Sequence, residues 1–201
     1  MIEEIFRKYL EIKSINDLNE VQIPSNNYSL KLIEFKDFQL NKFFYKEIGK
    51  KCYWFDRLAW TDQNWIEYVS NKNLITYVLK DNDNLVGYGE IILNKEKQES
   101  EIAYFGILEE YFGKKLGGFF LTELIKKSFS LNVKRVWVHT CSLDHKNALK
   151  NYLARGMKVF HRKHIQSIFD LTIAIYLSKN IFDRFVYKKI YLIENLLDQL
   201  N

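Results

Sequence analysis

The sequence predicts an α+β (mixed α/β) domain, and three observations support this class. Apolar residues alternate on both sides of the polar turn at 81–84, which indicates an antiparallel hairpin. Residues 101–164 then have the pattern of strand, helix, strand, helix and strand. A chain of 201 residues, with 47% hydrophobic and 16% aromatic residues, is long enough for one sizeable core and short for two. We therefore expect residues 1–201 to form a single domain.

Residues 1–70 are expected to form three helices and one strand. Apolar residues from Ile2 to Ile12 recur at helical spacing, which predicts a short amphipathic N-terminal helix. Polar residues around Pro24 then interrupt the pattern. The other elements expected up to residue 70 are a strand at 30–35, a helix at 38–49, and a helix capped by Thr61 or Asp62 that runs to Val69.

From residue 74 on, a mostly antiparallel run of strands is expected, followed by alternating strands and helices. Gly106 indicates a bulge or a close backbone approach within a strand, and Gly156 stands where a C-terminal glycine cap belongs. Apolar spacing predicts a helical extension over 165–201, which either covers the core, the reading we favour, or pairs with another subunit. The elements expected before it are strands at 74–79, 85–93, 101–108, 133–140 and 157–164, and helices at 119–129 and 144–155.

Composition narrows the expected partners and compartment. The net charge of +5 is modest and spread along the chain, and no nucleic-acid motif accompanies it, so we expect no nucleic-acid partner. Cys52 and Cys141 lie far apart without metal-ligand spacing, which predicts a reducing compartment and no metal. Residues 1–10 lack the apolar core of a signal peptide, and no apolar run approaches the ~18 residues of a membrane span. We expect a cytoplasmic protein that does not bind membranes.

A loop rich in glycine and lysine precedes the helix predicted at 119–129. Gly113, Gly117 and Gly118 allow an anion to approach the backbone closely. Lys114 and Lys115 add positive charge beside them, and the first N–H groups of the helix favour phosphate at the same place. The nucleotide motifs G-x-G-x-x-G and G-x-x-x-x-G-K-S/T do not occur. The loop is therefore interpreted as a pyrophosphate cradle.

The same loop resembles the acetyl-coenzyme A loop of the GNAT superfamily of N-acetyltransferases. That loop has the pattern Q/R-x-x-G-x-G/A, which falls on Phe112, Gly113, Lys114, Lys115, Leu116 and Gly117. Phe112 stands where Gln or Arg is usual, and Lys115 stands where the first Gly is usual. A second GNAT-like pattern falls on Asn147, Ala148, Tyr152, Gly156 and Met157. The resemblance covers about residues 30–164 and looks like a bacterial subgroup with Trp-Val-His-Thr-Cys and Asp-His segments.

The resemblance implies a GNAT-like acyl-CoA N-acyltransferase fold, with a central mixed twisted sheet flanked by helices. The core would span 28–164, and acetyl-CoA would be the co-substrate. Strands 101–108 and 133–140 would be parallel neighbours that splay apart to admit the pantetheine arm. Backbone N–H groups at Ile107 and Leu108 would bind the arm and polarise the thioester carbonyl. Asn147 would be a side-chain partner of the cofactor.

Acetyl transfer to an amine needs a base and is helped by an acid. Glu101 aligns with the strand-borne glutamate that serves as general base in histone-acetylating relatives, and Glu90 is a second candidate. Either residue can instead be a solvated strand carboxylate. Tyr152 matches the family tyrosine often assigned as general acid to the coenzyme A thiolate, although an aromatic on the inner face of a helix gives the same pattern.

The acceptor site and two further polar groups remain open at this stage. Trp54, Trp60, Tyr88 and Tyr104 either line an aromatic pocket for a small-molecule or protein amine, or belong to the core. His139 and Cys141 share a strand face, but no third and fourth metal ligands support them, so a structural role is favoured. Asp144 is expected to cap the helix that follows it.

The first hypothesis is an acetyl-CoA dependent N-acetyltransferase that works by direct attack in a ternary complex. The alternative is a GNAT-fold module that binds coenzyme A without turnover, which the departures at Phe112 and Lys115 motivate. A third hypothesis is an interaction protein that acts through 165–201, and a homodimer is possible.

Overall fold

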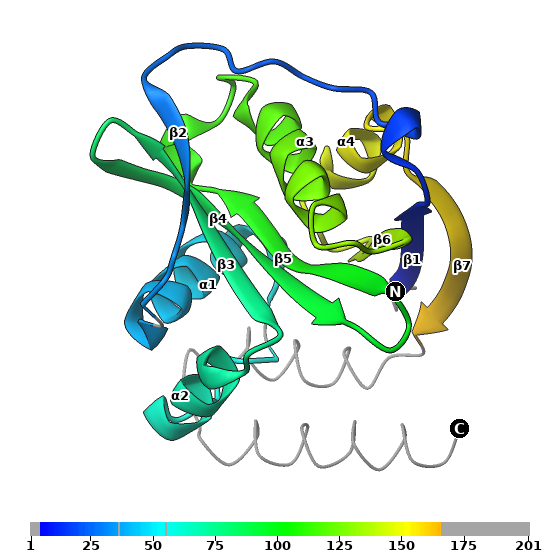
Figure 1. Ribbon diagram of the computed structural model, residues 1–201. Helices are drawn as coiled ribbons and strands as arrows, with labels where there is room; N and C mark the ends of the chain where they lie inside the picture. The colour runs from blue at the N-terminus through cyan, green and yellow to red at the C-terminus, as the bar shows by residue number, and fades with distance from the viewer. Residues whose placement is uncertain (1–4, 36, 55, 166–201) are drawn as a thin grey trace, which may run out of the picture.

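The computed structural model describes residues 5–35, 37–54 and 56–165, which form one seven-stranded sheet with helices on both faces (Figure 1). The predicted mixed α/β class is confirmed, whereas the helical extension predicted from residue 165 falls on 166–201, outside the described residues. The described helices are α1 (Phe38–Cys52), α2 (Asp62–Ser70), α3 (Leu116–Phe129) and α4 (Ala148–Ala154). The strands are β1 (Ile5–Ile12), β2 (Tyr28–Leu32), β3 (Leu74–Asp81), β4 (Asn84–Asn94), β5 (Glu99–Ile107), β6 (Arg135–Cys141) and β7 (Lys158–Ile165).

The strands lie in the order β2-β3-β4-β5-β6-β1-β7. Every neighbouring pair is antiparallel except β5 and β6, which are parallel. Helices α3 and α4 lie on one face of the sheet, and α1 and α2 lie on the other (Figure 1). The parallel pair therefore stands near the middle of the sheet, between two helical layers.

Residues 5–12 form a strand, so the prediction of an N-terminal helix over 2–12 is wrong. β1 lies between β6 and β7 and pairs with both. Its side chains alternate between the faces, so Leu10 and Ile12 enter the core while Tyr9 takes the opposite face. An interior strand carries apolar residues on both faces, and here their spacing imitates a helical repeat. The sheet thus includes residues well before 28, where the core was expected to start.

The other predicted elements are found, with shifted bounds in several cases. Thr61 caps α2 in a capping box with Asn64, and β3 and β4 form the predicted hairpin. The helix predicted from residue 144 begins only at Ala148. Asp144 accepts hydrogen bonds from Thr140 Oγ1 (2.6 Å) and the Cys141 N–H (3.0 Å), so it closes the turn after β6 and does not cap the helix.

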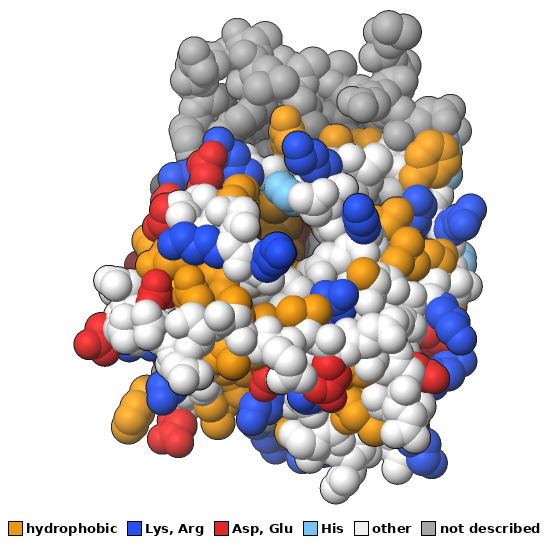
Figure 2. Space-filling model, turned by 90° about the horizontal axis from the view of Figure 1, so that it is seen from above, with side chains coloured by type: hydrophobic (Ala, Val, Ile, Leu, Met, Phe, Trp, Pro, Cys, Tyr) orange, Lys and Arg blue, Asp and Glu red, His pale blue; other side chains and the backbone are white. Residues whose placement is uncertain are grey.

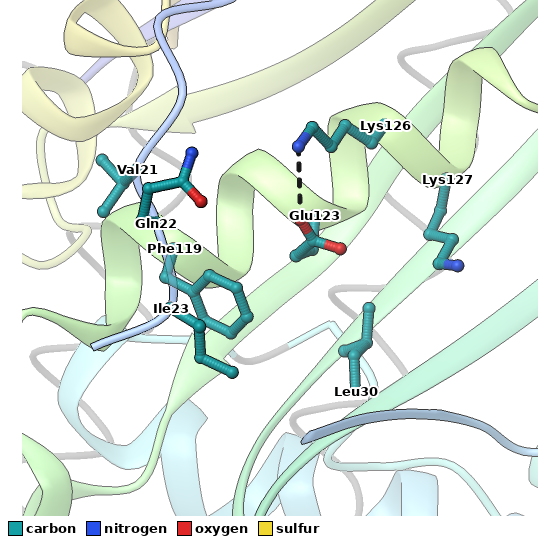
Figure 3. A pocket seen from close by; sticks show the side chains of 8 residues that line it. All are labelled: Val21, Gln22, Ile23, Leu30, Phe119, Glu123, Lys126 and Lys127. Atoms are coloured by element: carbon teal, nitrogen blue, oxygen red, sulfur yellow. Dashed lines mark ion pairs between the residues drawn. The ribbon is translucent and has the colours of Figure 1, made fainter. Parts of the chain in front are cut away.

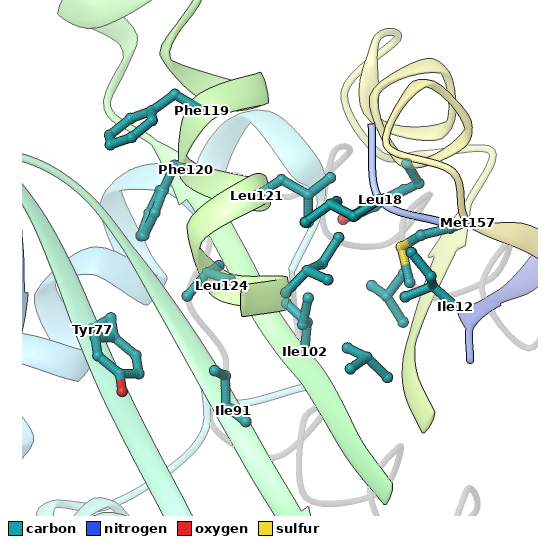
Figure 4. Packing of buried hydrophobic residues seen from close by; sticks show 14 of the residues in the cluster. Ile12, Leu18, Tyr77, Ile91, Ile102, Phe119, Phe120, Leu121, Leu124 and Met157 are labelled. Atoms are coloured by element: carbon teal, nitrogen blue, oxygen red, sulfur yellow. The ribbon is translucent and has the colours of Figure 1, made fainter. Parts of the chain in front are cut away.

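Two apolar clusters hold the helices against the sheet. Residues of α3, among them Phe120, Leu121 and Leu124, pack on the sheet residues Ile91 and Ile102 (Figure 4). On the opposite face, a second cluster joins α1 to the sheet through Phe44, Ile48, Val78, Tyr88 and Leu108. Ile102 of β5 belongs to the first cluster and Tyr104 of β5 packs against the second, so β5 is held from both sides.

Glycines permit close packing at two positions singled out in the sequence. A Cβ atom at Gly106 would lie 2.4 Å from Ile48 Cγ2, so the close approach at this glycine is made by α1. The bulge lies earlier in β5, at Ala103, where the pairing register with β4 shifts. Gly156 follows α4 with a φ of +92°, and a Cβ there would lie 2.0 Å from the Asp17 carbonyl oxygen. This confirms its role as the glycine that ends the helix.

Candidate functional site

The central feature of the site is the short pairing between β5 and β6. The two parallel strands are paired only at Glu99, Ser100 and Glu101, opposite Arg135 to Trp137. Beyond Glu101 they pair no further, although β5 continues to Ile107 and β6 to Cys141. The splaying expected from the resemblance is therefore present. It leaves the facing backbone N–H and C=O groups of the two strands without hydrogen bonds to each other.

The register of β5 decides which backbone groups face this gap. The Leu108 N–H donates to the Val86 carbonyl oxygen (2.8 Å), so it is not free to bind the pantetheine arm as expected. Successive N–H groups along a strand point to opposite edges, and Ile107 is directly opposite Gly87 in a pair without hydrogen bonds. The N–H of Ile107, and by the same alternation that of Phe105, point toward β6.

The loop after β5 leads into the N-terminus of α3 with an open backbone. Gly113 has a φ of +80°, and a Cβ there would meet no atom within 4 Å. Lys115 is the residue before α3 and has a left-handed φ of 60°, with no side chain capping the helix. The first N–H groups of α3, at Leu116, Gly117 and Gly118, have no partner within the helix. The loop therefore has the space and the donors that a phosphate group needs.

Side chains on both sides of the gap meet near this loop. Phe112, 44% exposed, packs against His145 with ring centroids 5.3 Å apart, and Lys114 Nζ lies 4.3 Å from the centroid of the Tyr111 ring. Asn151 Nδ2 donates to the Gly117 carbonyl oxygen (3.0 Å) and so ties α4 to the start of α3. Seen from this end, the surface has a recess near its middle with Lys and Arg side chains around it (Figure 2).

The two cofactor-side residues on α4 have different surroundings. Asn147 is exposed just before the first turn of α4, and its side chain caps no helical N–H. Tyr152 is 6% exposed within the core cluster under α3. Burial, together with the negative charge of Asp144, raises the pKa of the Tyr152 hydroxyl, so it stays protonated at neutral pH. Asn147 is accessible to a ligand, whereas Tyr152 has a proton to give from a buried position.

Glu101 lies where β5 and β6 begin to diverge. Its side chain is 22% exposed, and burial raises its carboxyl pKa to about 7 despite the opposing positive charges of Arg57 and Arg7. His139 Nε2 lies 3.8 Å from Glu101 Oε1, which is too long for a hydrogen bond. A carboxyl group with a pKa near neutrality can accept a proton and release it again at pH 7.

His139 is electrically neutral beside that carboxyl group. Burial, with the positive charge of Arg7, lowers the pKa of the His139 imidazole to about 4. Its contact with Glu101 is therefore not an ion pair at neutral pH. Among the described residues, no three His, Cys, Asp or Glu side chains group as metal ligands around His139 and Cys141 or elsewhere.

Glu90 has surroundings unlike those of Glu101. Its side chain is 0% exposed, and its carboxylate accepts hydrogen bonds from Asn41 Nδ2 (2.7 Å), Arg57 Nη1 (2.9 Å) and Tyr68 Oη (2.7 Å). Each carboxylate oxygen already has a partner, and no solvent reaches the group. The structure gives Glu90 the role of a buried anion that joins α1 and α2 to the sheet.

The aromatic residues proposed as an acceptor pocket gather around Arg57. Ring centroids lie 3.9–5.7 Å from its guanidinium carbon, and its side chain is 5% exposed. The rings belong to Tyr45, Trp60, Trp65, Tyr68 and Tyr104. Trp54 packs on Tyr104 with centroids 4.9 Å apart, and Tyr88 is wholly buried against Phe44. These rings enclose a cation that belongs to the protein itself.

Sequence reasoning did not identify Arg57 or Arg7 as parts of this site, whereas Asp56, like Trp60, was open to either a pocket or a core role. Asp56 accepts hydrogen bonds from the Tyr45 hydroxyl (2.8 Å) and the Tyr104 hydroxyl, which fixes it beside Arg57. The sequence did contain one signal for Arg57, namely the charged pair Asp56 and Arg57 inside the aromatic segment 53–65. Buried cations commonly lie on aromatic faces. Arg7 gave no such signal, since its segment was assigned to the wrong element.

A separate pocket of about 350 Å³ lies on the outer flank of α3 (Figure 3). Val21, Gln22 and Ile23 line one side of it, and Glu123 on α3 pairs with Lys126 across 3.7 Å. Of the residues proposed from the sequence for catalysis or cofactor binding, none lines this pocket.

Among the helices that the structure describes, none has the length and apolar character of a membrane span.

Comparisons with known proteins agree with this geometry. Residues 38–157 match the model of the Acetyltransferase (GNAT) family, which is more than half of the chain. The fold and the splayed strands are those of a GNAT-type acyltransferase. The chain belongs to the GNAT acetyltransferase family. A search of curated proteins finds no significant match.

Solved structures share the fold at low identity. A GCN5-related N-acetyltransferase from Sphaerobacter thermophilus has a TM-score of 0.62 and 16% identity, over 82% of this chain and 53% of that chain. One from Kribbella flavida has a TM-score of 0.57 and 11% identity, over 81% and 57%. An aminoglycoside acetyltransferase from a soil metagenome has a TM-score of 0.56 and 10% identity, over 73% and 97%. The chain thus spans little more than half of the first two.

The buried ion pair yields a stability prediction. Replacing Arg57 by Met leaves the Glu90 carboxylate buried without its cation, which should lower the free energy of unfolding by about 3–5 kcal/mol. Lys42→Met is the control, because it removes only the exposed pair with Asp62 and should cost less than about 1 kcal/mol. Urea unfolding measures both. Equal losses in the two variants would contradict the structural role of Glu90.

The left-handed Lys115 yields a second prediction. A side chain in this conformation costs about 1–2 kcal/mol, so Lys115→Gly should raise the free energy of unfolding by about 1 kcal/mol. The same change should weaken coenzyme A binding several-fold at low salt, because it removes a positive charge beside the phosphate loop. Lys115→Ala loses the charge and keeps the strain, so it should weaken binding without gaining stability. Undiminished binding by both variants would show that the ammonium makes no phosphate contact.

Proposed function

We propose that this protein transfers an acetyl group from acetyl-CoA to a primary amine by direct attack in a ternary complex. The observation that carries the proposal is the gap between β5 and β6, with Glu101 at its narrow end and the N-terminus of α3 at its wide end. Members of the family use acetyl-CoA as co-substrate. A cofactor that binds along this gap would place its phosphates at the wide end, near α3, and its thioester at the narrow end, near Glu101.

The residues around the gap fit coenzyme A. The open backbone at Gly113 and the free N–H groups at the start of α3 suit the pyrophosphate, and the surrounding Lys and Arg side chains add charge attraction. The inward N–H groups of Phe105 and Ile107 suit the amide and thioester oxygens of the arm. Asn147, exposed at the start of α4, is a further polar partner.

Two side chains then move the protons. Glu101 takes a proton from the acceptor ammonium, so that the amine nitrogen can bond to the acetyl carbon as the bond from that carbon to sulfur breaks. The pKa of about 7 suits a base that works near neutral pH. Tyr152, which burial keeps protonated, is the proposed donor to the leaving thiolate, and it then recovers the second proton that the nitrogen releases as the amide forms. Glu90 is not proposed as the base, because three donors occupy its carboxylate.

The alternative is a module that binds coenzyme A without turnover. Phe112 favours it, because its ring meets His145 across the mouth of the gap, where the family has a Gln or Arg. The raised pKa of Glu101 favours an enzyme, since a binding module has no need of a carboxyl group held near neutrality.

Calorimetric titration of acetyl-CoA into the purified chain tests the proposal first. We expect saturable binding, and transfer to at least one member of a panel of primary amines, followed as thiol release. Binding without transfer to any amine would favour the non-catalytic module. No binding at millimolar acetyl-CoA would reject both.

The pH dependence tests Glu101. Activity needs the ionised carboxylate, so kcat/KM should rise with pH and level off above about pH 7. Glu101→Gln should lower kcat by about 100-fold or more and remove this rise. Glu99→Gln is the matched control on the same strand. It takes away a negative neighbour that raises the pKa of Glu101, so the rise should remain and move to lower pH. An unchanged profile in Glu101→Gln would reject the assignment.

A further inference from the structure

Arg7 shares a face of the sheet with the proposed catalytic carboxyl group. On β1, Leu10 and Ile12 point into the core under α3, so Arg7 and Tyr9 point to the opposite face. Tyr9 is directly opposite His139 on β6, with ring centroids 5.9 Å apart, and Arg7 is opposite Cys141. Arg7 and His139 are therefore diagonal neighbours, a spacing that long side chains bridge.

The guanidinium of Arg7 has unused hydrogen-bonding capacity. Its Nε atom is buried and has no acceptor, and no ion pair or hydrogen bond joins its side chain to any other residue in the described part of the chain. Arg57 and Arg135 differ, since the first pairs with Glu90 and the second bonds to two glutamates. A half-buried cation with an unfilled donor carries a desolvation cost that a bound anion removes.

The positive charge of Arg7 affects the pKa values of His139 and of the proposed catalytic Glu101. After burial, the positive charge of Arg7 is the next largest cause that lowers the pKa of His139, and it also opposes the raised pKa of Glu101. His139 Nε2 in turn lies 3.8 Å from Glu101 Oε1. Arg7, His139 and Glu101 thus form one continuous polar strip across β1, β6 and β5.

We propose that Arg7 binds a carboxylate of the acceptor, so that the acceptor is an amino acid with its amine and carboxylate in one molecule. The inference rests on the proposed acetyl transfer and names its substrate class. The planar guanidinium can hold a carboxylate through two parallel hydrogen bonds, which supplies the missing acceptor for Nε. The amine of the same molecule is then directed toward Glu101.

A diamine acceptor fits the strip less well. Asp56, whose negative charge acts on His139, is one carboxylate that a second ammonium group would use. Its two oxygens already accept hydrogen bonds from the Tyr45 and Tyr104 hydroxyls, and Arg57 lies 3.9 Å from it. On this face the Arg7 cation has no anionic partner among the described residues, so the ligand should supply an anion there.

The test compares free amino acids with their primary amides as acceptors. The panel includes α-, β- and γ-amino acids, the matching amides, and an aminoalkyl phosphate, each assayed with acetyl-CoA. For the wild type we expect kcat/KM to be higher for the acid than for its amide. Arg7→Met should lower the ratio of acid to amide by about 10- to 100-fold, mainly through KM, and Arg7→Lys should lower it less.

Lys8→Ala is the matched control. It removes a positive charge from the same strand, and its side chain points to the other face, so the ratio should change less than about twofold. Coenzyme A titration of each variant confirms that it is folded.

Several outcomes would overturn the inference. Acetyl-CoA binding with no acetylation of any free acid would do so and leave the cofactor site standing. Amides acetylated as well as acids, an unchanged ratio in Arg7→Met, or preference for the aminoalkyl phosphate would also reject a carboxylate at Arg7. Failure of the wild type to bind acetyl-CoA would remove the proposed function, and this inference with it.

Discussion

The divergence of β5 and β6 is the constraint on which the rest of the site depends. Two parallel strands that pair at three positions and then separate expose the inner edge of β5. The bulge at Ala103 and the contact of α1 with Gly106 hold β5 in that position. Because exposed backbone N–H groups need partners, the gap favours an extended polar ligand. The same divergence sets the start of α3 at its wide end and Glu101 at its narrow end.

A second consequence is the division of labour between two glutamates. Glu90 is neutralised by Arg57 and filled with hydrogen bonds, and it holds α1 and α2 on the sheet. Glu101 is mostly buried without such partners, so its carboxyl pKa is raised to about 7 and the group can bind and release a proton near neutral pH. Arg57 thereby satisfies one carboxylate and leaves the other reactive. A buried carboxylate with hydrogen-bond partners stabilises the fold, whereas a buried carboxyl group without them has a raised pKa and can exchange a proton near neutral pH.

Local patterns predicted much of this fold, and long-range pairing explains the misses. The hairpin, the Thr61 cap and the Gly156 turn are set by neighbouring residues, so the sequence reveals them. The strand at 5–12 was taken for a helix because its structure depends on partners at 136–141 and 158–165. Arg7 was missed for the same reason. Glu101 was found by resemblance, whereas its pKa depends on burial and on the distant charges of Arg57 and Arg7. The carboxylate of Glu90 is occupied by Asn41, Arg57 and Tyr68, which are also distant in the sequence.

Hydrogen exchange of the β5 backbone, with and without coenzyme A, tests the central claim most directly. We expect coenzyme A to slow exchange at the inward amides of Phe105 and Ile107 and at the first amides of α3. The Leu108 amide, already bonded to Val86, should change little. Unchanged exchange at Phe105 and Ile107 under saturating coenzyme A, or protection confined to the pocket beside Lys126, would contradict the account.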